Sequence, residues 1–181
     1  MRPLRSKAVE QSTLSSPLRM ALRRLLAALA LLAASCVQAA SGDALFAMTL
    51  SGSDDKPIAL ETFRGKPLIV NFWARWCAPC RVEIPELVKT QDTYRKRGLQ
   101  VIGIGLEDKA ESVRDFMKAY EMNYTVLLAR DKGIELMQAL GNSKAGLPYT
   151  IVLNRRGEIV ASKLGVMNRA DLDAAAVAAL K

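Results

Sequence analysis

The stretch that decides the fold is Pro67-Leu-Ile-Val-Asn-Phe-Trp-Ala-Arg-Trp-Cys-Ala-Pro-Cys-Arg81. Residues 67–74 are mostly apolar and rich in branched and aromatic side chains, which is typical of a buried strand. Residues from 81 to about 97 have apolar side chains at helical spacing. Cys77 and Cys80 therefore stand at the junction between a strand and a helix.

The spacing of these two cysteines allows a disulfide to close within one turn of chain and to open again. The first turn of a helix offers unpaired backbone N–H groups and the positive end of the helix dipole, and both stabilise a thiolate. We expect Cys77 to be the attacking nucleophile and Cys80, about one turn further along, to be the resolving thiol that breaks a mixed disulfide. Arg75 and Arg81 either add positive potential here or face solvent.

The cysteine pair has two other interpretations. A structural zinc site usually takes four Cys or His ligands, but the chain has no His and three Cys, so we expect no metal. A purely structural disulfide is the second, although such bridges stabilise a protein more when they close longer loops. We expect no cofactor besides a redox-active disulfide between Cys77 and Cys80.

The N-terminal region has the pattern of an export signal. Residues 25–34 contain only Leu and Ala, and small residues follow as far as Ala40. Three arginines precede this run: Arg19, Arg23 and Arg24. This pattern is typical of a secretory signal peptide. A helix that spans a bilayer needs about 20 apolar residues, and the run is shorter than that. We expect cleavage near Ala39 and a periplasmic protein.

This pattern divides the chain into an extension with a signal peptide, 1–40, and one domain, 41–181. Two alternatives to cleavage remain open. An uncleaved N-terminus would anchor the protein in the membrane, and Cys36 follows Leu-Ala-Ala-Ser in an arrangement that resembles a bacterial lipoprotein box. The start of translation at Met1 or Met20 is also left open by the sequence.

The positive charge of the chain belongs mostly to its N-terminal region. The formal net charge is +8, but positions 1–40 hold six of the 26 basic residues and one of the 18 acidic ones. The remaining residues carry 20 basic and 17 acidic side chains, which leaves +3. No basic face interleaved with aromatic residues emerges, so we expect no nucleic-acid partner. In an exported protein, a dithiol needs a partner that keeps it reduced or reoxidises it.

The rest of the domain alternates strand and helix patterns. An N-terminal β-hairpin is predicted from 44–50 and 58–60, and strand 67–74, the helix 80–97 and strand 99–106 form a βαβ unit. The later elements are predicted as helix 110–121, strand 124–128, helix 132–140, a hairpin of 149–153 and 158–163, and helix 170–180.

Three segments together resemble the thioredoxin superfamily, and more narrowly its TlpA/ResA branch of exported thiol-disulfide oxidoreductases. They are 70–85 around the cysteines, Gly146-Leu-Pro-Tyr-Thr150, and Asn154-Arg-Arg-Gly-Glu158. The resemblance covers 44–181. It implies an α/β thioredoxin fold, with a central mixed sheet flanked by helices, an N-terminal β-hairpin extension and a helix-strand insertion.

The resemblance also implies an activity. Relatives of this branch reduce protein disulfides with electrons from a membrane-bound donor, in cytochrome c maturation or a related pathway. We expect the same dithiol-disulfide exchange here, carried out by a monomer. Two alternatives stay open: a disulfide oxidase or isomerase of the same fold, because the sequence does not fix the reduction potential, and a non-catalytic peptide-binding or chaperone module.

Three residues are assigned to substrate binding by the resemblance. Pro148 corresponds to a cis-proline whose loop faces the dithiol, and the backbone of Leu147 pairs with a substrate peptide. Without the resemblance, Pro148 would be an ordinary proline at the start of a strand, because about 5–6% of X-Pro bonds are cis. Trp76 flanks the thiolate and offers an apolar contact to the substrate, or else is a half-buried surface aromatic.

The sequence departs from thioredoxins proper at one position that affects the mechanism. Thioredoxins carry a buried aspartate on the strand before the cysteines, whereas this chain has Asn71, and an amide does not titrate. The proton of Cys80 must therefore go to another group. Glu83, one turn after Cys80, and Asp108, after strand 99–106, are possible proton relays, and the alternative for each is a solvated surface carboxylate.

Overall fold

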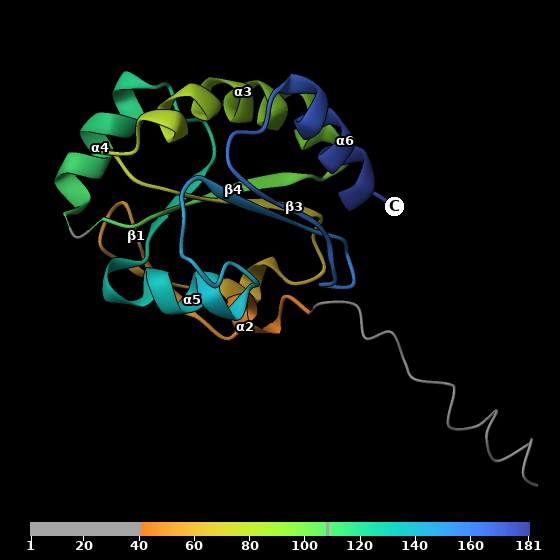
Figure 1. Ribbon diagram of the computed structural model, residues 1–181, viewed down its shortest axis with the longest axis horizontal. Coiled ribbons are helices and arrows are strands. Elements are labelled where there is room, and N and C mark those ends of the chain that lie inside the picture. The colour runs from red at the N-terminus through yellow and green to blue at the C-terminus, as the bar shows by residue number, and fades with distance from the viewer. Residues whose placement is uncertain (1–40, 108) are drawn as a thin grey trace, which may run out of the picture. The chain divides into compact units, whose positions relative to one another are not determined.

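The computed structural model describes residues 41–107 and 109–181. Its strands form one seven-stranded sheet in the order β2-β1-β5-β4-β3-β6-β7 (Figure 1). The strands are β1 (Thr49–Gly52), β2 (Pro57–Ala59), β3 (Leu68–Trp73), β4 (Gln100–Gly105), β5 (Thr125–Leu128), β6 (Tyr149–Leu153) and β7 (Ile159–Leu164). The helices are α2 (Asp43–Phe46), α3 (Ala78–Tyr94), α4 (Ala110–Ala119), α5 (Gly133–Ala139) and α6 (Arg169–Ala179), with short 3-10 helices η1 (Leu60–Phe63), η2 (Arg95–Arg97) and η3 (Arg130–Lys132).

Strand β3 lies near the middle of the sheet, and all six of its residues are buried. Because side chains alternate along a strand, Ile69 and Trp73 belong to one hydrophobic cluster and Val70 and Phe72 to another. The first cluster lies beneath α3, α4 and α6, and the second faces α2 and α5 (Figure 1). Both clusters and the seven strands that the structure describes lie within residues 41–181.

The connections confirm the predicted fold class. Strands β3 and β4 are parallel and are joined by α3, as parallel neighbours require a crossover. Strands β6 and β7 continue the sheet as an antiparallel hairpin. The pair α4 and β5 is the helix-strand insertion, and β5 pairs with β4 on one side and with β1 on the other.

The prediction of one strand over 44–50 is wrong in its first part. Residues Asp43–Phe46 form α2, and β1 begins at Thr49. Leu45 and Phe46 are adjacent and both buried. A strand would direct adjacent side chains to opposite faces, whereas a helical turn can direct both into the same core. Strands β1 and β2 pair antiparallel as predicted, and Leu60 already belongs to η1.

The helix after the cysteines begins earlier than predicted, at Ala78, because Cys77 caps it. Among the residues described, no helix combines the length and apolar character needed to cross a bilayer. The expectations for 25–34, Cys36 and the cleavage site concern residues 1–40, which lie outside the described residues.

Candidate active site

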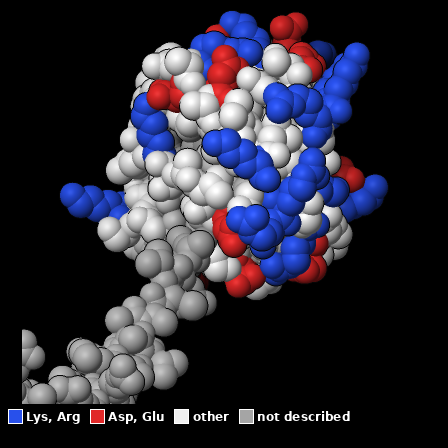
Figure 2. Space-filling model, turned by 90° about the vertical axis from the view of Figure 1, so that its right-hand side faces the viewer, with Lys and Arg blue, Asp and Glu red and all other residues white. Residues whose placement is uncertain are grey.

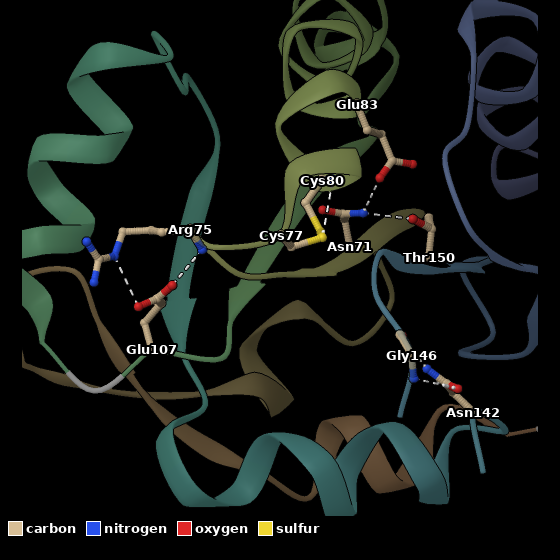
Figure 3. The surroundings of a disulfide bond; sticks show 9 residues. All are labelled: Asn71, Arg75, Cys77, Cys80, Glu83, Glu107, Asn142, Gly146 and Thr150. Carbon is tan, nitrogen blue, oxygen red and sulfur yellow. Dashed lines mark hydrogen bonds and ion pairs between the residues drawn. A yellow bond between two sulfur atoms is a disulfide. The ribbon is translucent and has the colours of Figure 1, made fainter. Parts of the chain in front are cut away.

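Cys77 and Cys80 form a disulfide at the start of α3, with their Cα atoms 5.3 Å apart (Figure 3). Cys77 has extended backbone angles and is the N-cap residue of the helix, and its Sγ accepts a hydrogen bond from the N–H of Cys80 at 3.3 Å. Pro79 lies in the first turn, where the missing N–H costs no helical hydrogen bond. The sequence therefore places one sulfur at the position where a helix offers its free N–H groups.

The electrostatics of this position favour an anion. The helix behind Cys77 has 17 residues, and its first turn contains no Asp or Glu. The dipole and the free N–H groups therefore act on the sulfur without a competing carboxylate in that turn. Cys77 is 5% exposed and Cys80 is 1% exposed, so Cys77 is the sulfur that an incoming molecule reaches first.

The residues predicted to bind substrate lie at the same end of β3 as the disulfide. Trp76 is 72% exposed, so it is not a half-buried aromatic. The peptide bond between Leu147 and Pro148 is cis. Phe72 lies opposite Tyr149 in the antiparallel pair of β3 and β6, so Pro148 meets the end of β3 that leads to the cysteines. The sheet thus brings together segments that are 70 residues apart in the sequence, and their contact with substrate stays a prediction.

The loop before Pro148 is held by a residue that the sequence analysis missed. The buried side chain of Asn142 donates to the carbonyl oxygen of Gly146 at 2.8 Å and accepts from the N–H of Gly146 at 3.3 Å (Figure 3). The N–H of Gly165 donates to the carbonyl oxygen of Pro148 at 2.8 Å. Both ends of the cis-proline segment are therefore fixed by hydrogen bonds.

Glu83 is fully buried, so the alternative of a solvated surface carboxylate is wrong for this residue. Its Oε2 accepts from Asn71 Nδ2 at 2.9 Å, and its Oε1 accepts from the N–H of Met167 at 2.9 Å. Asn71 Nδ2 also donates to Thr150 Oγ1 at 2.9 Å. In the view of Figure 3, the amide of Asn71 lies between Glu83 and the disulfide. An amide on β3 thus orients a carboxyl group on α3.

Burial raises the pKa of Glu83 to about 7, because the carboxylate loses its hydration. Hydrogen bonds from the Met167 N–H and from Asn71 lower the pKa of Glu83, and the positive charge of Lys163 does so too, but burial dominates. At neutral pH both protonation states of this carboxyl group are populated. A group of this kind can accept and return a proton one helical turn from Cys80.

A second buried carboxylate, Glu107, follows β4 and was not singled out from the sequence. Its Oε1 accepts from the N–H of Arg75 at 2.6 Å, and its Oε2 accepts from Arg75 Nε at 3.1 Å (Figure 3). Arg75 is therefore paired with a carboxylate that offsets its positive charge. Because β3 and β4 are parallel neighbours, the residues that follow them lie at the same sheet edge, a signal that could have indicated Glu107. Asp108 lies outside the described residues.

Comparisons with known proteins agree with this geometry. Residues 40–179 match the family model described as Redoxin. The thiol-disulfide oxidoreductase ResA of Halalkalibacterium halodurans is 30% identical over 129 residues, which cover 71% of each chain. ResA of Bacillus subtilis is 30% identical over 118 residues, 65% of this chain and 64% of that protein.

A solved structure gives the same result. The crystal structure of a thiol:disulfide interchange protein of the thioredoxin family from Chlorobium tepidum TLS matches with a TM-score of 0.66 and 31% identity. The match covers 74% of this chain and 93% of that one. The chain therefore belongs to the Redoxin family, and it is a TlpA/ResA-like thiol-disulfide oxidoreductase of the thioredoxin superfamily.

Proposed function

We propose that this protein is exported and reduces disulfides of other proteins. The observation that supports this proposal most is the placement of Cys77 at the N-cap of α3, next to an exposed tryptophan and at the same end of the sheet as a cis-proline loop. Cys77 can form a stabilised thiolate there, and a peptide can approach it along the loop. The export signal expected at 25–34 supports a location in the periplasm, where disulfides persist.

The reaction begins with the dithiol form. The Cys77 thiolate attacks one sulfur of the substrate disulfide, and the other substrate sulfur leaves as a thiolate. Cys80 then loses its proton and attacks the Cys77 sulfur in the mixed disulfide. This step releases the second substrate sulfur and forms the Cys77–Cys80 disulfide seen in the structure. Two electrons pass to the substrate, which becomes a dithiol.

Glu83 takes up the proton that Cys80 releases. It can do so because it lies on the same helix one turn further along, and because its pKa of about 7 leaves part of the population ionised at neutral pH. Asn71 cannot titrate, and it acts by orienting the carboxyl group. Asp108 stays a second possible relay.

A membrane-bound donor of electrons is needed to regenerate the dithiol, and cytochrome c maturation or a related pathway is the proposed context. The reducing direction rests on the relatives named ResA. Equilibration of the purified domain with glutathione tests it. A reduction potential more oxidising than about −180 mV, the value typical of protein disulfide isomerase, would instead favour the oxidase or isomerase alternative.

The substrate is found most directly by trapping. Cys80→Ser should leave the mixed disulfide on Cys77 unresolved, so that partners accumulate as reducible adducts, whereas the matched variant Cys77→Ser should trap none. The alternative, a non-catalytic binding module, predicts that the protein keeps its function in the cell without either cysteine. If the variant with both cysteines replaced by alanine restored the wild-type phenotype to a strain that lacks the gene, the redox function would be excluded.

A further inference from the structure

The end of the domain opposite the disulfide carries a cluster of Lys and Arg side chains. Strand β3 runs from this end toward the cysteines, so its six residues separate the two ends by about 20 Å. Three segments contribute: the loop between η1 and β3, the 3-10 helix η2, and the turn between β6 and β7. We call the cluster the basic end; it comprises Arg64, Lys66, Arg95, Lys96, Arg97, Arg155 and Arg156.

The three segments of the basic end are in contact. Arg155 Nη2 donates to the carbonyl oxygen of Arg97 at 3.4 Å, which joins the β6–β7 turn to η2. Arg64 Nη1 pairs with Asp43 at 3.0 Å. Asp43 follows Gly42, whose N–H donates to the carbonyl oxygen of Gly157 in the same turn at 2.9 Å. The cations therefore belong to one continuous surface.

Most of this positive charge is uncompensated. Arg64 pairs with Asp43 and Glu61, and Arg156 pairs with Glu158. In the part of the chain that the structure describes, the other five cations have no carboxylate within 4.0 Å. The seven cations and the three carboxylates that pair with them sum to +4, and Asp92, one turn before Lys96, lowers the sum to +3, so the remainder of residues 41–181, which carry +3 in all, is neutral. Figure 2 shows Lys and Arg side chains gathered on this side of the molecule.

The chain enters the domain at the same end. Ser41 forms a β-bridge with Glu158, directly after the arginines of the β6–β7 turn. The residues before Ser41, with the apolar run 25–34, are therefore joined to the domain beside the basic end. A segment that inserts into or leaves a membrane brings this end of the domain close to the lipid surface.

We propose that the basic end docks on the anionic phospholipid headgroups of a membrane, with the disulfide at the far end directed away from it. The inference rests on the export proposed above and not on the redox chemistry. Headgroups fit better than an acidic protein, because six of the seven cations are exposed and are spread over three separate segments, and because the chain enters beside them. Each Lys or Arg near an anionic surface adds roughly a fivefold gain in binding.

Sedimentation with vesicles tests the proposal on residues 41–181. The domain should bind phosphatidylcholine vesicles that contain about 30 mol% phosphatidylglycerol and should not bind vesicles of pure phosphatidylcholine. It should dissociate near 0.5 M salt, where the Debye length is only about 3–5 Å. The variant K96E/R155E should bind at least about tenfold more weakly. The matched control K132E/K144E makes the same change in net charge at exposed sites away from the basic end and should bind like the wild type.

Two further readouts separate the possible outcomes. Alkylation of reduced Cys77 should proceed at the same rate with and without anionic vesicles, since the sulfur is directed away from them. Failure of the wild-type domain to bind, equal weakening by both double variants, or protection of Cys77 on vesicles would each overturn the proposal. The K96E/R155E variant should exchange disulfides at the same rate as the wild type. If the wild-type domain bound vesicles but had no exchange activity, the proposed function would fail and the inference about membrane docking would stand.

Discussion

Replacement of Glu83 by Gln should remove a pH dependence of stability that this one residue creates. In the folded protein, burial raises the pKa of Glu83 to about 7, whereas an unfolded chain has the ordinary value of 4.5. Between these two values the folded state holds more protons than the unfolded state, so the free energy of unfolding falls as the pH rises. The decrease ends about one pH unit above the folded-state pKa, near pH 8, where the carboxyl group is ionised in both states.

The size of the effect follows from the shift. Each pKa unit corresponds to about 1.36 kcal/mol. Because the pKa of Glu83 is about 7 in the folded state and 4.5 in the unfolded state, the free energy of unfolding should be about 3 kcal/mol lower at pH 8 than at pH 4. Glu83→Gln also lowers the free energy of unfolding by a constant amount, because an amide pairs less well than a carboxyl group with the N–H donors of Asn71 and Met167. That cost does not change with pH, and only the slope reports on the carboxyl group.

Urea denaturation of the oxidised protein between pH 4 and pH 8 measures this slope. The disulfide keeps both cysteines from titrating, and subtraction of the Glu83→Gln curve cancels the contribution of the other carboxylates. Glu86→Gln is the matched control, since Glu86 lies on the same helix and pairs with Lys89 at the surface. Curves for the wild type and Glu83→Gln that stay parallel over the whole range would refute the assignment of the raised pKa.

Three further substitutions test the surroundings of the disulfide. Glu107→Ala removes the charged acceptor of the partly buried N–H of Arg75 and should cost about 1–3 kcal/mol of stability in urea denaturation, while Glu107→Gln retains an acceptor oxygen and should cost less. Trp76→Ala should change stability by less than about 0.5 kcal/mol, because the side chain is exposed, yet raise the KM for a protein disulfide several-fold. Asn142→Ala should lower the exchange rate and the melting temperature together, because it releases the loop before Pro148; an unchanged rate would show that the loop needs no such support.

Much of the fold could be predicted because its signals are local. The apolar run before the cysteines indicated a buried strand, and β3 is buried on both faces. The patterns that follow indicated a βαβ unit and a final hairpin, and the resemblance to the thioredoxin superfamily implied a mixed sheet; all three are confirmed. The segment around Leu45 and Phe46 was predicted incorrectly, because a short apolar run is compatible with either a strand or a helical turn until its packing partners are known.

The polar part of the site was less accessible to prediction. Asn71, Glu83 and Thr150 come from three elements, and their hydrogen bonds depend on a sheet register that the sequence does not reveal. The burial of Glu83 could not be distinguished from exposure by helical spacing alone. Glu107 could have been indicated by its place after a strand parallel to β3, but its bonds to Arg75 are shown only by the tertiary structure. Asn142 belongs to a segment without periodicity, and only the tertiary structure shows that it holds the loop before Pro148.

The measurement closest to the central claim is the pH dependence of alkylation of the reduced protein at Cys77. The free N–H groups and the dipole of α3 should stabilise the thiolate, so the midpoint should lie below about 8.5, the value of a free cysteine. Alkylation near pH 6 should then be faster than that of an unstructured peptide with the same Trp-Cys-Ala-Pro-Cys sequence. A midpoint and a rate equal to those of the peptide would contradict the proposed role of the helix terminus in activating this sulfur.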